Sequence, residues 1–222
     1  MTRPRIAVLM DENTSSGGTR YEAHKGYFHR LSEAGAAPFG VAYDADLVEE
    51  VIASFHGLLT AGGRFAYPAH WYLAPPDQGI ETARLDVETA LVLGFLAAGK
   101  PVLGICAGMQ TLAYLHGAKL TTDAPGHDHG APHAVTVEVG TRLGDLVGPE
   151  LTVNSYHREA IGRLAAGVVA TATAVDGVIE AIEIPAYPFA VGLQWHQELL
   201  GADHPGQAIF EGLARASSEV RR

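Results

Sequence analysis

Cysteine is nearly absent from this sequence, since Cys106 is the only one in 222 residues. A single cysteine excludes an intramolecular disulfide, so the chain does not require an oxidising compartment. Long apolar runs are also lacking. The longest, near residues 90–99, is about half of what a membrane span needs, and Ile6 to Met10 is too short for a signal peptide. We therefore expect a cytoplasmic protein.

Basic residues are scarce. Lys and Arg number 15 against 25 Asp and Glu, which gives a formal net charge of −10. Nucleic acids and anionic membranes bind clustered Lys and Arg, and the only clusters here are Arg3 with Arg5 and the pair Arg221-Arg222. Neither nucleic acid nor a membrane is an expected partner.

The pattern of apolar residues predicts an α/β fold in a single domain, residues 1–222. The composition is 47% hydrophobic and 18% charged, as in ordinary globular proteins. Strands and helices alternate in the first half, which is typical of a mostly parallel sheet covered by helices on both faces. From residue 134 the pattern is mostly β and predicts added antiparallel strands.

The individual elements follow from apolar periodicity and from glycine and proline boundaries. The expected strands are 6–10, 38–43, 56–61, 101–105, 134–139, 151–155, 168–174, 178–184 and 189–194. The expected helices are 21–34, one starting at 46, 80–98, 110–116 and 204–220.

Cys106 falls on the turn between an expected strand and an expected helix. Gly104 and Gly108 flank it at two residues on either side, the bracket of small residues that a sharp nucleophile elbow needs. A thiol at a helix N-terminus is favoured in its reactive thiolate form. A lone cysteine is more commonly an inert, buried side chain, but this bracket favours a nucleophile.

The last expected strand leads into His196 and Glu198. Residues two apart in extended backbone project to the same side, so Glu198 can orient the imidazole of His196. With Cys106, this pair would form a nucleophile, base and orienter. His-x-Glu alone is more typical of a structural histidine, and it is the place of the pair at the end of a buried strand that favours a catalytic role.

An acyl-transfer site also needs two backbone N–H donors for the oxyanion. The N–H of Ala107, which follows the nucleophile, is one candidate. The other is in Gly62-Gly63, because glycine at a strand end permits close approach. An ordinary turn is the alternative interpretation of the two glycines.

Two further stretches could belong to a site. The segment 64–79 contains Tyr67, Trp71 and Tyr72, which favour the rim of a pocket over a variable surface loop. His127, His129 and His133 with Asp128 could suggest a metal site. Their spacing fits no closed zinc pattern, and glycines and a proline mark the stretch as a loop, so we expect no metal here.

Several stretches together resemble the class I glutamine amidotransferase-like superfamily. They occur in order along nearly the whole chain, at 62–63, 104–110, 153–157, 176–183 and 192–198. Within that superfamily, the Asn-Ser-x-His and Asp-Gly-x-Ile-Glu-Ala stretches look most like the gamma-glutamyl-gamma-aminobutyrate hydrolases.

This resemblance implies a flavodoxin-like fold and a catalytic triad of Cys106, His196 and Glu198, with Gly63 and Ala107 as the oxyanion hole. The implied reaction is hydrolysis of a small-molecule γ-glutamyl amide through a thioester, without metal or organic cofactor. A homodimer is left open. The implied substrate-binding residues are Gly62, Gln110, Asn154, Ser155, Tyr156 and His157.

Three departures from the family pattern bear on the substrate more than on the reaction. Ala107 stands where many members have Arg, Gln197 where Pro is usual, and Arg158-Glu159 where His-Gln is frequent. Two other functions are therefore alternatives. One is a glutaminase subunit that delivers ammonia to a synthase partner; the other is a non-catalytic relative that keeps the triad in form only.

Overall fold

The computed structural model describes residues 2–12, 17–63, 67–74, 83–122 and 124–220. In this part of the chain one large sheet contains nine strands, with bounds, in spatial order, of β4 Ala37–Val41, β1 Arg5–Leu9, β5 Gly57–Thr60, β6 Val102–Ile105, β13 Ala190–Leu193, β12 Ile179–Glu183, β11 Val169–Ala174, β8 His133–Val137 and β9 Glu150–Val153. The neighbouring strands from β4 to β13 are parallel, and those from β13 to β9 are antiparallel.

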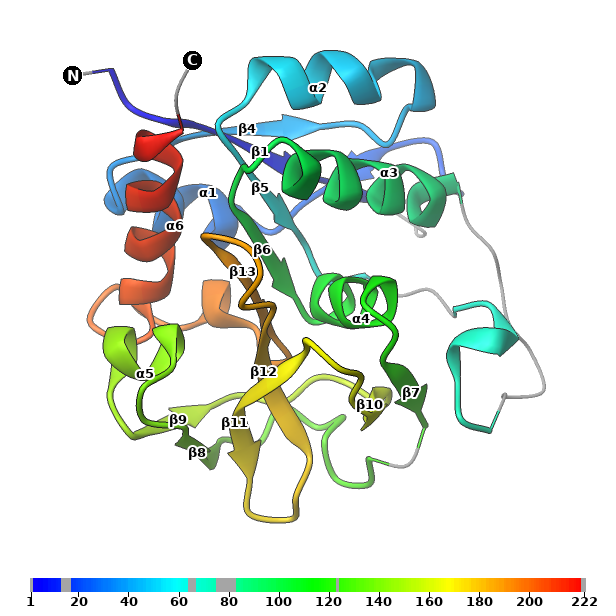
Figure 1. Ribbon diagram of the computed structural model, residues 1–222, viewed down its shortest axis with the longest axis vertical. Helices are drawn as coiled ribbons and strands as arrows, with labels where there is room; N and C mark the ends of the chain where they lie inside the picture. Colours follow the sequence, from blue (N-terminus) through cyan, green and yellow to red (C-terminus); the bar gives the residue numbers. More distant parts are fainter. Residues whose placement is uncertain (1, 13–16, 64–66, 75–82, 123, 221–222) are drawn as a thin grey trace.

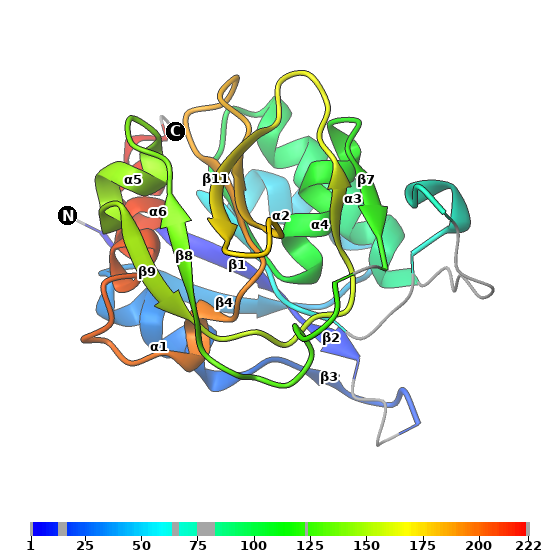
Figure 2. The same cartoon turned by 90° about the horizontal axis from the view of Figure 1, so that it is seen from below.

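Helices cover both faces of the parallel part. On one side lie α1 (Lys25–Glu33) and α6 (Gln207–Glu219), and on the other α2 (Val48–Ser54), α3 (Ala83–Ala97) and α4 (Ala107–Leu115) (Figure 1). Figure 2 shows β8 and β9 running together beside α5 (Arg142–Val147) at one edge. The expected fold class, a mostly parallel α/β sheet with antiparallel strands in the C-terminal half, is confirmed.

The central strands are apolar throughout because both of their faces are buried. In β1, Ile6 and Val8 pack with α1 and α6, while Ala7 and Leu9 pack with the core under α3. Side chains alternate across a strand, so a strand covered on both faces has no polar side. This is why the sequence shows continuous apolar runs here.

Some elements differ from those expected. The helix expected over 21–34 begins at Lys25, because Tyr21–Glu22 (β3) pairs with Asp11–Glu12 (β2) and because His24 caps the helix by accepting from the Gly26 N–H. The helix after Cys106 begins at Ala107 rather than Gln110. Not predicted were α5, the ribbon of β7 (Lys119–Thr121) and β10 (Ala160–Arg163), and the short 3-10 turns η2 (Ala45–Leu47), η3 (Ala69–Trp71) and η4 (Gln197–Leu199).

The aromatic side chains expected at a pocket rim are instead buried. Tyr67 stacks on Trp71 with ring centroids 4.8 Å apart, and Trp71 stacks on Tyr114 at 3.8 Å. Tyr72 packs beside Tyr67. Stacking against α4 removes these rings from solvent, so the expectation of a rim at these three residues was wrong; residues 64–66 and 75–82 lie outside the described part.

None of the helices in the described ranges combines the length and the apolar character that crossing a bilayer requires.

Candidate active site

Cys106 occupies a strained turn between β6 and α4. It is the N-cap of α4, with φ 54° and ψ −106°. Within the described residues no other non-glycine residue has a positive φ. Such a conformation costs about 1–3 kcal/mol and persists only where the surrounding structure enforces it. Strain of this kind at the single cysteine makes the turn a candidate functional site.

The two flanking glycines allow the turn to pack. A Cβ on Gly104 would collide with the carbonyl oxygen of Gly108, and a Cβ on Gly108 would lie 2.5 Å from the carbonyl oxygen of Thr60. Both positions therefore need glycine for close backbone contact, which confirms the reason given for the Gly-x-Cys-x-Gly bracket.

His196 and Glu198 lie next to this turn, at the end of β13 and in η4. The Nδ1–H of His196 donates to Oε1 of Glu198 at 2.6 Å, and Glu198 is buried. A Cβ on Gly62 would lie 2.7 Å from Cε1 of His196 and 3.5 Å from Cβ of Cys106. The imidazole and the thiol therefore meet over the glycine at the end of β5.

The surroundings of His196 favour its charged form. Burial by itself would lower the pKa of His196, but hydrogen bonds to Cys106 and Glu198, together with their charges, outweigh burial and raise it to about 10. The imidazole is then an imidazolium at neutral pH. A cationic neighbour favours the thiolate of a cysteine, which is the nucleophilic form.

The segment 154–157 is the neighbour of His196 on another side. Asn154 accepts from the His196 N–H and donates to the His196 carbonyl, both at 2.9 Å. The ring of Tyr156, which is 50% exposed, meets the imidazole edge-on with centroids 5.9 Å apart. Ser155 and His157 are buried and face His127 and Glu180 instead.

Gln110 is buried, and both ends of its side-chain amide are engaged. Its Oε1 accepts from the Tyr67 hydroxyl at 2.9 Å, and its Nε2 donates to the Glu159 carbonyl at 2.8 Å and to Oε1 of Gln194 at 3.0 Å. These bonds tie α4 to the end of β13. Contact of Gln110 with substrate stays a prediction.

Sequence reasoning missed Arg84, which binds the backbone of the segment that contains Gly62. This buried side chain donates to the carbonyls of Ala61 at 2.5 Å and Gly62 at 3.1 Å. It also pairs with Asp11 at 2.7 Å and with Glu88 at 3.4 Å. A signal was present in the sequence, because Arg84 and Glu88 are opposite charges four residues apart in a mostly apolar helix.

Arg84 also sets the direction of the Gly63 N–H. The peptide bonds of the described residues are trans, and in a trans peptide the C=O and the N–H point to opposite sides. With the Gly62 carbonyl on Arg84, the Gly63 N–H points away from the guanidinium. The Gly62 N–H is used elsewhere, since it donates to the Tyr27 hydroxyl at 3.1 Å.

Tyr27 is a second residue that sequence reasoning missed. Burial, and next the charge of Glu198, raise its pKa well above the usual value, so the phenol is neutral. A neutral hydroxyl accepts from Gly62 without placing a further negative charge beside Glu198.

A parallel α/β sheet with a strained cysteine elbow beside a histidine-carboxylate pair is the architecture of the class I glutamine amidotransferase-like proteins. The model of the Peptidase C26 family matches residues 4–198, and the chain belongs to this family. Members are hydrolases that act on amide bonds.

Relatives with names support this placement. The chain is 37% identical over 211 residues to a Mycobacterium tuberculosis protein named provisionally as a glutamine amidotransferase; the match covers 86% of this chain but only 66% of that protein. It is 26% identical over 240 residues to the gamma-glutamyl-gamma-aminobutyrate hydrolase of Escherichia coli, covering 97% of this chain and 94% of the relative.

Solved structures share the fold. A Thermoplasma acidophilum protein described provisionally as a GMP synthase subunit superposes with a TM-score of 0.73 at 20% identity, covering 98% of this chain and 96% of that chain. The glutaminase domain of Trypanosoma brucei CTPS, with bound acivicin, gives 0.70 at 15% identity, covering 99% and 95%.

Proposed function

We propose that this protein is a cysteine hydrolase that cleaves the γ-glutamyl amide bond of a γ-glutamyl-amine, such as γ-glutamyl-GABA, to glutamate and the free amine. The observation that carries the proposal is the elbow at Cys106, with φ 54°, beside a His196 that is bound at 2.6 Å to Glu198. This arrangement is the nucleophile, base and orienter of covalent amide hydrolysis.

In the first half of the proposed reaction, the Cys106 thiolate attacks the γ-carbonyl carbon. The oxygen of the tetrahedral intermediate accepts from the N–H groups of Gly63 and Ala107. The imidazolium of His196 gives its proton to the amide nitrogen as the C–N bond breaks. The amine leaves, and a γ-glutamyl thioester with Cys106 remains.

In the second half, His196 acts as a base. The neutral imidazole takes a proton from water, and the resulting hydroxide attacks the thioester carbonyl. The C–S bond breaks, which releases glutamate and restores the thiolate and the imidazolium. Glu198 keeps the ring oriented and stabilises its positive charge through both halves.

The substrate would lie over Gly62 and against the exposed ring of Tyr156. In this proposal Asn154 acts through the His196 backbone, and Ser155 and His157 support the segment from below. Tyr156 is the residue of the segment that is open to solvent, so it is placed to meet the amine half of the substrate.

A second candidate is a glutaminase subunit that delivers ammonia to a synthase partner. The name of the relative at 37% identity favours it. The two candidates predict different behaviour of the purified chain: the hydrolase turns over γ-glutamyl amides alone, whereas a glutaminase subunit acts on glutamine and gains activity when its partner is added.

The test is intact-protein mass spectrometry after brief incubation with a diazo-ketone analogue of glutamine. We expect a single adduct on Cys106 that γ-glutamyl-GABA blocks, and no adduct on the Cys106→Ala variant. Release of glutamate from a panel of γ-glutamyl-amines then identifies the amine. Absence of an adduct on a folded wild-type protein would overturn the proposal.

A further inference from the structure

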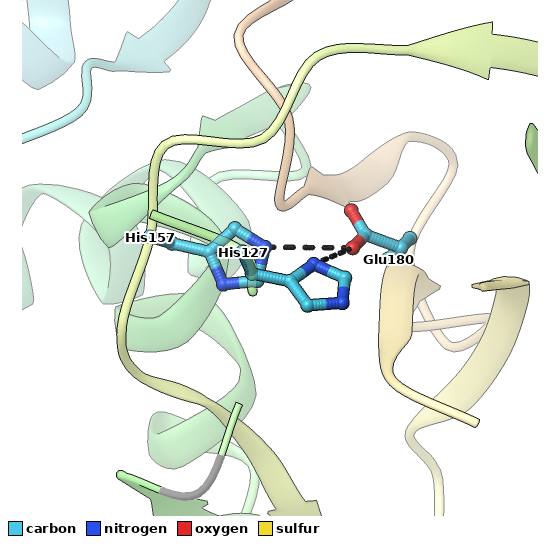
Figure 3. A group of neighbouring side chains, drawn as sticks. All are labelled: His127, His157 and Glu180. Atoms are coloured by element: carbon cyan, nitrogen blue, oxygen red, sulfur yellow. Dashed lines mark ion pairs between the residues drawn. The ribbon is translucent and has the colours of Figure 1, made fainter. Parts of the chain in front are cut away.

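Four side chains meet at one buried carboxylate next to the segment 154–157. Three belong to histidines 127, 133 and 157, and the fourth is Glu180 of β12. Oε1 of Glu180 lies 3.1 Å from Nδ1 of His127, 3.3 Å from Nε2 of His133 and 3.4 Å from Nε2 of His157. Figure 3 shows the rings of His127 and His157 directed at the Glu180 carboxylate, which is fully buried.

The outward nitrogens of two of these rings are already used as donors. Nε2 of His127 lies 2.9 Å from Oδ2 of Asp176, and Nδ1 of His157 lies 3.0 Å from the Glu159 carbonyl oxygen. Both partners can only accept, so both outward nitrogens carry the hydrogen. A neutral imidazole has one N–H. In the neutral form that binds a metal, the inward nitrogens of His127 and His157 direct lone pairs toward the Glu180 carboxylate.

The hydroxyl of Ser155 supplies no hydrogen to Nδ1 of His127. Oγ of Ser155 lies 3.0 Å from Nδ1 of His127, but its proton is donated to the His127 carbonyl at 2.8 Å. Among the described residues, both oxygens of Glu180 and the Nε2 atoms of His133 and His157 are buried without a hydrogen-bond partner. A buried carboxylate needs a cation beside it, and here that cation is either a protonated histidine or a bound metal ion.

We propose that His127, His157 and Glu180, whose donor atoms all lie within 4.8 Å of one another, bind one divalent transition-metal ion of the zinc type. Imidazole nitrogen with one carboxylate oxygen is a typical zinc donor set. Tetrahedral coordination with bonds of about 2.0–2.1 Å places donor atoms about 3.3–3.4 Å apart. The separations of Glu180 Oε1 from the His127 and His157 nitrogens, at 3.1 and 3.4 Å, match that spacing, and both are longer than the roughly 2.7–2.9 Å of a charged hydrogen bond.

The outer contacts also fit a metal site. Metal-binding histidines usually donate their second N–H to a carboxylate or a carbonyl, and here Asp176 and the Glu159 carbonyl accept in this way. A cavity of about 270 Å³ is lined in part by His127, His133 and Asp176, and it provides an entry path. Three protein donors leave one tetrahedral position for a water molecule.

The site lies beside the residues that position His196, so the ion would affect catalysis only indirectly. The ligand His157 and the segment residue Ser155, which binds His127, flank Tyr156, and Asn154 holds the backbone of His196. The ion would therefore fix the segment that positions His196. His157 is a positioning residue in this arrangement, and the ion takes no part in the bonds that break.

The test uses the full chain with Cys106→Ala, because a thiol and His196 could bind zinc by themselves. After chelator treatment, Zn²⁺ is added and bound metal is counted by equilibrium dialysis with elemental analysis. We expect one equivalent, a raised thermal midpoint, and tetrahedral absorption bands when Co²⁺ replaces Zn²⁺. Asp176→Asn should lower the affinity by roughly 10- to 100-fold, and His157→Gln and Glu180→Gln should lower it further.

His129→Ala is the matched control, because this histidine belongs to the same loop but its side chain is 75% exposed and pairs with Asp128. It should bind zinc as the parent does. No bound zinc, or equal binding by the parent, Asp176→Asn and His157→Gln, would overturn the proposal. Asp176 is near the surface, so its variant keeps the test decisive if Glu180→Gln does not fold. Counting metal is independent of activity, so the outcome is separate from that of the proposed hydrolase.

Discussion

The side-chain amide of Asn154 binds both polar groups of the His196 backbone, accepting from its N–H and donating to its C=O at 2.9 Å each. The strand β13 ends at Leu193, before His196 is reached. The amide therefore replaces the strand pairing that has ended and fixes the residue that carries the imidazole.

Replacing Asn154 should lower kcat more than it changes KM. Asn154→Asp keeps the acceptor but places a carboxylate oxygen against the His196 carbonyl, and Asn154→Ala removes both bonds. Each of the two hydrogen bonds contributes about 0.5–1.5 kcal/mol, so we expect their joint loss to lower kcat by about 5- to 150-fold, with Asp at least as harmful as Ala. Equal kcat for wild type and both variants, measured on γ-glutamyl amides, would show that the two bonds from Asn154 to the His196 backbone are dispensable.

Cys106→Ala should abolish turnover, with a loss of roughly 10⁴- to 10⁶-fold, since removal of a nucleophile removes the covalent route. The fold should persist, because Cys106 contributes little to the core beyond its small side chain. Thermal unfolding checks the fold, and glutamate release checks the activity. A folded Cys106→Ala variant with wild-type turnover would be incompatible with both enzyme functions considered above.

The sequence predicted the parallel half of the fold well, for a physical reason. Strands buried on two faces must be apolar throughout, as Ile6 to Leu9 are. The first turn of α4 was missed because Gly108 disfavours a helix by itself, and its close packing on Thr60 decides the structure. The β7–β10 ribbon joins short segments about 40 residues apart, and no local pattern predicts such a pairing.

The candidate site divides in the same way. The glycine bracket of Cys106 and the His-x-Glu pair are local signals, and the structure brings these residues together. Their catalytic roles stay predictions. The bonds from Asn154 to His196, the contacts of Arg84 and the cluster around Glu180 all join segments that are far apart in the sequence. His127 and His133 fit no zinc spacing because their partners in the cluster, His157 and Glu180, follow only after further strands.

Protonated His196 should stabilise the folded protein up to an alkaline pH. Burial lowers its pKa, but Cys106 and Glu198 raise it to about 10. The folded-state pKa lies above the ordinary 6.5. This part of the free energy of unfolding is therefore fully present below about pH 6.5 and is lost as the pH rises through about 10. Glu198→Gln removes one of the charges that raise the pKa, so the loss should then occur at lower pH.

Urea unfolding of wild type and His196→Gln at several pH values measures this contribution. The stability difference between the two proteins should shrink as the pH rises from about 6.5 to about 10. Glu198→Gln should also move the alkaline limb of kcat/KM to lower pH, and it should cost less activity than His196→Ala. A stability difference that stays constant over this range would contradict the raised pKa of His196.

Arg84 connects the stability of the core to the geometry of the site. Its guanidinium donates to the Ala61 and Gly62 carbonyls and pairs with Glu88, whose carboxylate is fully buried. Burial, opposed chiefly by the charge of Arg84, raises the pKa of Glu88. Removing Arg84 alone leaves a buried acid without its partner, which confounds a catalytic effect with unfolding.

The double variant Arg84→Met with Glu88→Met separates the two effects. Arg84→Met alone should cost about 3–5 kcal/mol of stability, because it leaves Glu88 unpaired, whereas replacing both charges by apolar side chains should restore most of it.

The Ala61 and Gly62 carbonyls still lack their donor in the double variant, so the Gly63 N–H is no longer held in place. Loss of one oxyanion donor costs about 100- to 1000-fold in kcat; a misdirected donor should cost about 10- to 100-fold, with KM nearly unchanged. Glu88→Gln, which keeps Arg84 on both carbonyls, is the control and should retain kcat. Recovery of both stability and kcat in the double variant would show that Arg84 serves the fold alone.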